Sequence, residues 1–457
     1  MDTSLRPNAY PATENARKHL LMPAEEMSKL GTEVRPLLTH GEGVYLFDES
    51  GRRYIDGPAG MWCTQIGYGR QEIAKAIADQ AMKLSYNSPW YTINSPSSEL
   101  AARIAEKTPG DLNRIFFTTG GSTAVDTALR FTEFYNNVLG RPEKKKIIVR
   151  KNGYHGSTQL TASCSGREGN WPNFDIANDR IKFISSPDKR HRGTRSEAAF
   201  LQDLVEEFES TIDEIGPDKV AAFLAEPLLA SGGVVIPPRG YHARIKAICE
   251  SHDIIYISDE VVTAFGRCGE WFASEKVFGV VPDIITFAKG LTSGYVPMGG
   301  LAISERLLAR ISGEAANGSY FTNGYTYTGH PVSSAAALAN MDVIENDGLL
   351  EHVRKVGVYF AERLAGLATL PSIWDVRTAG LIGCVECITE PGRTFADESD
   401  KRLTGVVDRL CFERGLVVRP IANMCVLSPP LTINRQEIDE MCDILRSAIM
   451  DATTETQ

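Results

Sequence analysis

An apolar run that ends at a lysine stands in the second half of the chain, in the stretch 284-IITFAKGLTSGYVPMGG-300. The run is typical of a buried strand, and the glycines after Lys289 allow a tight turn. A lysine at this place has two interpretations. It is either a solvated side chain just past the strand, or an amine kept partly out of water so that it reacts as Schiff-base lysines do. The rest of the sequence decides between them.

Short apolar strands and helices alternate around this stretch. Strands are expected at 114–119, 146–150, 181–185, 220–226, 254–259, 283–288 and 299–304. Helices fit between several of them, at 124–136, 197–211 and 240–252. This alternation predicts an α/β domain with a mostly parallel sheet that is buried on both faces.

Both ends of the chain have a different pattern. After residue 331 the sequence predicts a helix over 333–346 that continues after Gly348, strands near 374–388, a helix over 401–413, strands at 416–420 and 424–430, and a last helix from 436. Toward the N-terminus it predicts a helical stretch at 24–30, two strands within 43–56, and helices over 71–84 and 97–108, the second with Ser97 as its N-cap.

These patterns predict more than one domain, because 457 residues are too many for one ordinary core. Residues 1–70 form an N-terminal segment that joins the small domain. Residues 71–330 form the large domain, and residues 331–457 form a C-terminal small α+β domain.

Composition excludes several classes of partner. The net charge of −10 argues against nucleic acid and anionic membrane surfaces. No apolar run approaches the roughly 20 residues that cross a bilayer, and no signal peptide is visible, so a cytoplasmic location is expected. The chain has 9 cysteines. The pair in 384-CVEC-387 lies on a predicted strand that points its two thiols to opposite faces, so we expect free buried thiols and no metal site.

Polar residues end three of the predicted strands. Glu226 ends VAAFLAE, Asp259 ends IIYISD, and Lys289 follows IITFA. Ligands of open α/β sheets bind at the carboxyl ends of the strands. Three residues of complementary charge at such ends therefore predict a single site, although each residue alone has an ordinary structural explanation.

A fourth strand end carries glycines and a serine, in 114-RIFFTTGGSTAVDTALRF-131. Backbone N–H groups at a helix N-terminus bind anions, and glycine lets a phosphate approach closely. Alone, this turn also suits a plain strand–helix connection. A phosphate cradle, a reactive lysine and a buried carboxylate together are what pyridoxal phosphate requires. The turn 152-NGYHGST-158 adds an aromatic face through Tyr154.

The residues resemble those of class III pyridoxal-phosphate aminotransferases of fold type I, most closely the omega-transaminases that use amines with pyruvate. The resemblance extends from about Leu38 to the last helix. It rests on 57-GPAGMWCTQIGYGR-70, 152-NGYHGST-158, 225-AEPLLASGG-233, 258-SDEVVTAFGRCG-269, 286-TFAKGLTSGY-295, 324-GYTYTGHP-331 and 417-VVRPIANMCVLSPP-430.

The resemblance implies a role for each matching residue around the cofactor. Lys289 forms the imine with pyridoxal 5'-phosphate, and Asp259 is the partner of the pyridine nitrogen. Val261 packs on the ring face opposite Tyr154. Glu226 lies near the O3′ side of the ring.

The resemblance also implies contacts beyond the ring. Gly121 and Ser122 bind the phosphate, and Thr326 reaches the phosphate of a neighbouring subunit, which implies a homodimer with shared sites or a tetramer of such dimers. Trp62 and Tyr154 are substrate-pocket aromatics. Arg419 grips a substrate carboxylate, so the implied substrates are an amine donor and a 2-oxo acid acceptor.

The phosphate turn departs from the common pattern Ser-Gly-Ser-Glu-Ala, because this chain reads 120-GGSTA-124. Gly120 removes a hydroxyl and Thr123 removes a carboxylate. Other class III enzymes (an aminomutase, racemase or decarboxylase) and a non-catalytic relative are alternatives. A Schiff-base aldolase without cofactor fits less well, because it needs neither Asp259 nor a phosphate site.

Overall fold

A seven-stranded sheet forms the centre of the computed structural model, which describes residues 12–33, 35–177, 179–390, 392–393 and 395–456. Its strand order is β4-β10-β9-β8-β7-β5-β6, and the pairs from β9 to β6 are parallel, whereas β10 is antiparallel to β9 and β4. The predicted fold class is thus confirmed. The strands are β4 (Arg114–Thr118), β5 (Lys146–Arg150), β6 (Ile181–Ile184), β7 (Val220–Ala225), β8 (Ile255–Asp259), β9 (Ile284–Phe287) and β10 (Gly299–Ile303).

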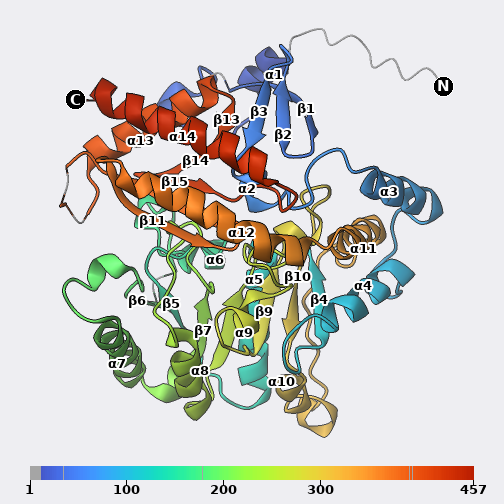
Figure 1. The fold of residues 1–457 in the computed structure, drawn as a ribbon. Helices are drawn as coiled ribbons and strands as arrows, with labels where there is room; N and C mark the ends of the chain where they lie inside the picture. Colours follow the sequence, from blue (N-terminus) through green and yellow to red (C-terminus); the bar gives the residue numbers. More distant parts are fainter. Residues whose placement is uncertain (1–11, 34, 178, 391, 394, 457) are drawn as a thin grey trace.

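Alternating side chains of this sheet enter two separate cores. On β5, Ile147 and Val149 pack in one apolar cluster with α5, whereas Ile148 packs in another with α7 and α8. The helices of this part are α3 (Gln71–Lys83), α4 (Ser95–Ala105), α5 (Gly121–Val138), α6 (Gln159–Ser163), α7 (Glu197–Ile215), α8 (Tyr241–Ser251), α9 (Ala273–Lys276), α10 (Glu305–Ala309) and α11 (Pro331–Asn346). Helices therefore cover both faces, as a parallel sheet requires (Figure 1).

Two smaller sheets accompany the large one, and the first of them joins strands from the two ends of the chain. The first has the order β1-β2-β3-β13, and Leu416 of β13 lies opposite Ile55 of β3 in parallel register. The second, β11-β12-β15-β14, is antiparallel and lies beside the last helices in Figure 1. The division at residues 70 and 330 stays a prediction. The elements are β1 (Leu38–Glu42), β2 (Tyr45–Asp48), β3 (Arg53–Asp56), β11 (Ile373–Ala379), β12 (Ile382–Cys387), β13 (Leu416–Val417), β14 (Arg419–Ile421), β15 (Met424–Leu427), α1 (Ala12–His19), α2 (Ala59–Trp62), α12 (Leu349–Ala365), α13 (Glu398–Glu413) and α14 (Arg435–Thr456).

Three local predictions are wrong. The stretch 24–30 holds only a 3-10 turn at Met27–Lys29, and the first helix is α1. Helix α4 begins earlier than expected, because the side chain of Asn94 caps it by accepting from the Ser97 N–H. The predicted strand 416–420 is two strands, since the chain leaves the sheet of β3 and enters that of β15.

The two free cysteines of β12, Cys384 and Cys387, have the side-chain directions predicted for a strand. Cys384 packs in one apolar cluster and Cys387 in another, so the two thiols point to opposite faces of the strand. Within the described residues, no group of His, Cys, Asp or Glu side chains could hold a metal ion. In the same residues, no helix is long and apolar enough to cross a membrane.

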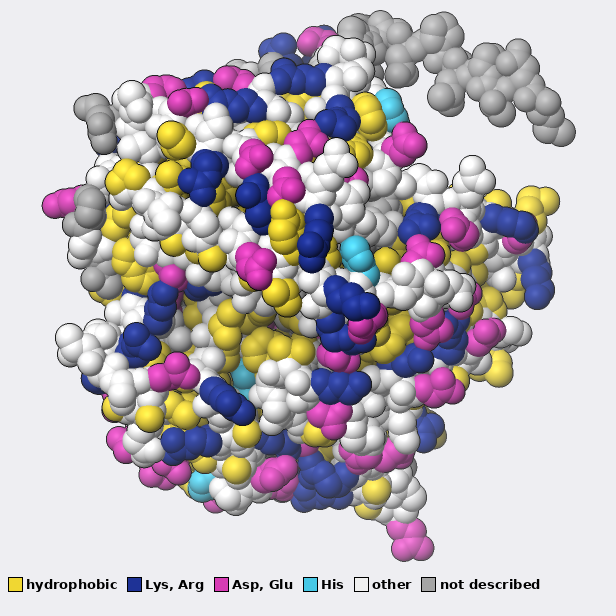
Figure 2. Space-filling view, in the orientation of Figure 1, with side chains coloured by type: hydrophobic (Ala, Val, Ile, Leu, Met, Phe, Trp, Pro, Cys, Tyr) yellow, Lys and Arg dark blue, Asp and Glu magenta, His cyan; other side chains and the backbone are white. Residues whose placement is uncertain are grey.

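Charges of both signs are interspersed on the face shown in Figure 2. Lys and Arg side chains lie next to Asp and Glu side chains there. Among the described residues many such charges form ion pairs, such as Arg70 with Asp347 and Arg354 with Glu351. A phosphate backbone is bound by a patch or stripe of basic residues. This face has no such stripe.

Candidate active site

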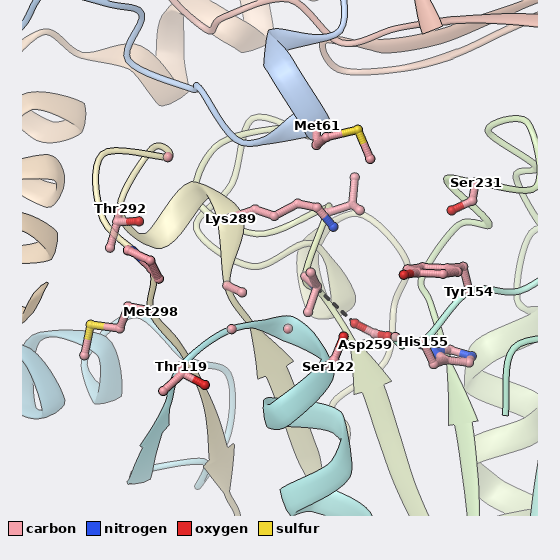
Figure 3. A pocket seen from close by; sticks show the side chains of 18 of the residues that line it. Met61, Thr119, Ser122, Tyr154, His155, Ser231, Asp259, Lys289, Thr292 and Met298 are labelled. Atoms are coloured by element: carbon pink, nitrogen blue, oxygen red, sulfur yellow. Dashed lines mark hydrogen bonds and ion pairs between the residues drawn. The ribbon is translucent and has the colours of Figure 1, made fainter. Parts of the chain in front are cut away.

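A cavity of about 410 Å³ lies where three strands of the large sheet end. Glu226 after β7, Asp259 at the end of β8 and Lys289 after β9 all line it. Figure 3 shows the Lys289 amine between Met61 above it and the start of α5 below. Parallel strands bring their carboxyl ends to one edge of the sheet. The three polar strand ends of the sequence therefore meet in one cavity.

Lys289 is the amine of this cavity. Its backbone takes the left-handed conformation at φ 38°, and its side chain is half-buried with Nζ 5.7 Å from the centre of the Trp62 ring. Burial lowers the pKa of the Lys289 amine, and Arg419 acts in the same direction, while Asp259 raises it. Burial is the main cause, and most neighbouring charges are negative.

Asp259 is held by contacts from three elements. Its Oδ2 lies 2.7 Å from His155 Nδ1, and its Oδ1 accepts from Val261 N–H at 3.2 Å and from the Thr286 hydroxyl at 3.2 Å. The carboxylate is only 4% exposed. The partner His155 is a residue that the sequence prediction left without a chemical role. The turn 152–158 was singled out, but no local pattern shows that its histidine meets a carboxylate 104 residues further along the chain.

The N-terminus of α5 lines one end of the cavity. The first turn of a helix leaves its N–H groups without acceptors in the helix, and no described side chain accepts from Gly121 or Ser122. Ser122 Oγ accepts from the Ser157 N–H at 3.0 Å, which leaves its own proton to donate. A Cβ on Gly121 would lie 2.9 Å from Val261, so glycine allows the close approach of helix and strand end.

The unusual residues of this turn have separate consequences. A Cβ on Gly120 would meet no atom within 4 Å, so this glycine faces open space where a hydroxyl is missing. The Thr123 hydroxyl donates to the Gly120 carbonyl at 2.9 Å. Thr123 therefore stabilises the turn, and the anion site depends on backbone N–H groups and Ser122.

Comparison with known proteins agrees with this geometry. The family described as aminotransferase class-III matches residues 28–449. The chain is 36% identical to putrescine–pyruvate aminotransferase of Pseudomonas aeruginosa over 437 residues, covering 95% of this chain and 94% of that protein. The chain belongs to the class III aminotransferases. It is also 36% identical to diaminobutyrate–2-oxoglutarate transaminase of Halomonas elongata, covering 91% of this chain and 90% of that protein.

Solved structures of aminotransferases have the same fold. The (S)-enantioselective omega-transaminase of Thermomicrobium roseum superposes with a TM-score of 0.92 at 36% identity, covering 96% of this chain and 98% of that chain. A thermostable omega transaminase mutant from Pseudomonas jessenii gives 0.94 at 32% identity, covering 98% and 100%. The resemblance stated from the sequence is confirmed.

Class III aminotransferases depend on pyridoxal phosphate, and the cavity of this aminotransferase fits that cofactor. Free backbone N–H groups at the start of α5 suit its phosphate. Lys289 offers an amine with a lowered pKa, Asp259 offers a carboxylate for the ring nitrogen, and Val261 lines the wall between them. When bound, the cofactor supplies an aldehyde that condenses with amines and a ring that withdraws electrons.

Tyr154 and Glu226 lie together on one side of the aminotransferase cavity. Both line it, and the Tyr154 N–H donates to Glu226 Oε1 at 3.1 Å. The other carboxylate oxygen accepts from Ala230 N–H at 2.9 Å. Burial raises the pKa of Glu226, which is 5% exposed. These contacts hold the tyrosine ring beside the cavity, as Figure 3 shows.

Three predicted residues are placed differently from the others. Trp62 is 4% exposed within an apolar cluster and reaches the site only through its ring next to Lys289, whereas Met61 lines the cavity. Thr326 is exposed and lies outside the cavity. Arg419 is half-buried beside the site, and its Nε is buried without a partner among the described residues.

Arg419 is the first residue of the short strand β14. Arg419 lies opposite Val426 in a hairpin of β14 and β15 whose turn includes Ala422 at φ 52°. Pro420 is tolerated in β14 because this strand is at the edge of its sheet, where a missing N–H breaks no ladder.

In cofactor-free protein, Lys289 is expected to be acetylated at lower pH than the exposed lysines. Burial lowers its pKa, and only the neutral amine reacts. Peptide mass spectrometry over a pH series gives the midpoint, with the exposed lysines of the same sample as reference. Asp259→Asn should move the midpoint further down, because the carboxylate raises the pKa of the amine. A midpoint at or above that of the exposed lysines would contradict the assignment.

Proposed function

We propose that this aminotransferase moves an amino group from a primary amine or ω-amino acid to a 2-oxo acid such as pyruvate, with pyridoxal phosphate held at Lys289. The observation that carries the proposal is the guanidinium of Arg419, which lacks a counter-ion among the described residues. This half-buried group lies close enough to Lys289 and Tyr154 to interact with their charges. A buried cation without a counter-ion is costly, and a substrate carboxylate would supply one.

Each residue of the cavity has a role in the proposed reaction. Lys289 moves the proton between the substrate carbon and the cofactor, because its amine is neutral more often than that of an exposed lysine. Asp259, oriented by His155 and Thr286, stabilises a proton on the ring nitrogen. Gly121 and Ser122 bind the phosphate. Tyr154 and Val261 face the ring from opposite sides.

The proposed reaction is tested by its two half-reactions, measured separately. A primary amine without a carboxylate should convert the enzyme to its pyridoxamine phosphate form in the absence of any acceptor, and pyruvate should then restore the pyridoxal form with release of alanine. A racemase or decarboxylase would return its cofactor to the pyridoxal form in a reaction with one substrate. Failure of the amine to yield stable pyridoxamine phosphate would refute the proposal. A panel of amines then ranks the donors by kcat/KM.

Arg419→Ala is expected to lower kcat/KM for pyruvate by about 10- to 150-fold, which is the scale of a charged hydrogen bond. The half-reaction with an amine that lacks a carboxylate should change less than about twofold, because nothing in that amine needs a cation. Single-turnover absorbance measures both steps. Arg414→Ala is a matched control, since this arginine pairs with Asp451 on α14. Equal losses in the two half-reactions would mean that Arg419 supports the structure instead.

We also propose that two copies pair and share their sites. Large apolar side chains are exposed on the last turn of α3 with the segment that follows it, and on 320–327. The two segments meet where the Tyr86 hydroxyl donates to the Thr326 carbonyl at 3.0 Å. Exposed apolar surface of this kind marks interfaces. Thr326 lies within it, so it can reach the phosphate of the other copy. A single chain in sedimentation equilibrium of the holoenzyme would refute the pairing. The exposed residues are Met82, Leu84, Tyr86, Trp90, Tyr91, Ile93, Tyr320 and Tyr327.

A further inference from the structure

A second cavity of about 520 Å³ adjoins the active site. Ser231 lines both cavities, and Figure 3 shows it with Tyr154 on one side of the active site. The second cavity is walled by 151–152, by the loop 166–170 after α6, and by the turn of the β14–β15 hairpin. A substrate that extends past Ser231 therefore enters a space formed by residues of both the large sheet and the C-terminal hairpin.

Arg167 stands in the wall of this second cavity on a fixed backbone. The residue before it, Gly166, bridges to Lys151 at the end of β5, and its carbonyl accepts from Asn152 N–H at 2.9 Å. A Cβ on Gly166 would lie 2.6 Å from the Arg150 carbonyl oxygen, so the two segments are in close contact. The position of Arg167 is therefore set by the strand that also carries the Tyr154 turn.

The guanidinium of Arg167 is half-buried and has no anionic partner within the part of the chain that the structure describes. Among the described residues it forms no ion pair and no hydrogen bond, and Glu168, the one carboxylate lining this cavity, does not pair with it. Of the other Lys and Arg residues of the wall, Lys151 is exposed to solvent, and the remaining two are paired with carboxylates. Arg190 pairs with Asp188 and Glu386, and Lys401 pairs with Glu398.

Arg167 also lies near the second unpaired guanidinium, that of Arg419. Burial lowers the pKa of Arg167, and the charge of Arg419 lowers it further, while Tyr154 and Glu226 of the active site act in the opposite direction. Two partly buried like charges repel each other, and this repulsion is relieved when each binds an anion. The active site and the adjoining cavity thus present two free guanidinium groups to one extended ligand.

We propose that Arg167 binds the distal carboxylate of a dicarboxylic 2-oxo acid acceptor, so that it determines how well 2-oxoglutarate is accepted relative to pyruvate. Arg419 binds the carboxylate next to the keto group, and the chain of the acceptor passes Ser231. The inference rests on the proposed function, because it assumes a 2-oxo acid in the active site. The inference adds Arg167, which the shorter pyruvate does not reach.

The first test compares acceptors in the half-reaction that starts from the pyridoxamine phosphate form. Arg167→Gln is expected to lower kcat/KM for 2-oxoglutarate by about 10- to 100-fold, the scale of a charged hydrogen bond, with pyruvate changed less than about twofold. Arg167→Lys should retain part of the preference, since it keeps the charge. Lys151→Gln is the matched control, because this exposed lysine lines the same cavity next to Gly166. A loss below about threefold, or an equal loss for both acceptors, overturns the proposal.

The second test measures binding without turnover. Glutarate and butyrate differ by one carboxylate, and neither has a keto group. Calorimetry of the pyridoxal form should give a Kd for glutarate at least about tenfold below that for butyrate, and Arg167→Gln should abolish the difference. Equal affinities in the wild-type protein overturn the proposal. Because this comparison needs no amino transfer, it separates a failure of Arg167 binding from a failure of the proposed function, which the pyruvate half-reaction decides.

Discussion

Lys289→Ala is expected to abolish amino transfer, with a loss of at least about 10⁴-fold in kcat. The variant lacks both the amine that holds the cofactor and the base that moves the substrate proton. Its fold should survive. The Lys289 side chain forms no hydrogen bond or ion pair with any described residue, and alanine has the same backbone preference at φ 38°. Single-turnover absorbance with an added amine measures the loss.

Two controls separate chemistry from folding in this variant. Thermal unfolding should shift by only a few degrees, and Lys276→Ala, which removes an exposed lysine paired with Glu270, should keep wild-type activity. Borohydride reduction of the wild-type holoenzyme should attach the cofactor to the peptide that contains Lys289. Wild-type turnover by Lys289→Ala, or attachment at another lysine, would refute the assignment.

The convergence of Glu226, Asp259 and Lys289 follows from the sequence because strands have a simple physical signature. A strand buried on both faces is a short apolar run, and its carboxyl end shows as the first polar residue. Parallel strands bring their carboxyl ends to one edge of the sheet, so this prediction does not require the conformations of the loops. The glycine-rich turn before α5 also gives a signal, because glycine lets a phosphate approach the N–H groups at the start of a helix.

The features of the site that the sequence did not show depend on contacts between distant segments. His155 meets Asp259 across 104 positions, and no periodicity encodes that distance. Trp62 and Met61 are neighbours in the motif 57–70. The backbone of Trp62 at φ 63° turns its ring into the core, and Met61 lines the cavity. Arg167 gave no signal at all. Its proposed role rests on the lack of an anionic partner among the described residues, and only the side-chain contacts of the folded chain show this.

Asp259→Asn is expected to lower kcat by about 10²- to 10³-fold, on the scale of one preorganised electrostatic partner. Asparagine can keep the shape of the site. Its carbonyl oxygen can accept from Val261 N–H and Thr286 as Oδ1 does, and its amide can face His155 Nδ1. The substitution therefore removes the negative charge and little else, so the ring nitrogen loses the group that stabilises its proton.

The sign of the effect on Lys289 makes this prediction specific. The Asp259 charge raises the pKa of the lysine amine, so its removal lowers that pKa and leaves more neutral amine at any pH below it. Slower turnover in Asp259→Asn then cannot come from a protonated Lys289. In the pH profile, the pH below which activity falls should move down or stay unchanged. The test is a pH profile of the single-turnover rate beside its magnitude at the optimum. A loss below about tenfold, or about 1.4 kcal/mol, would mean that Asp259 only holds the turn around His155 in place.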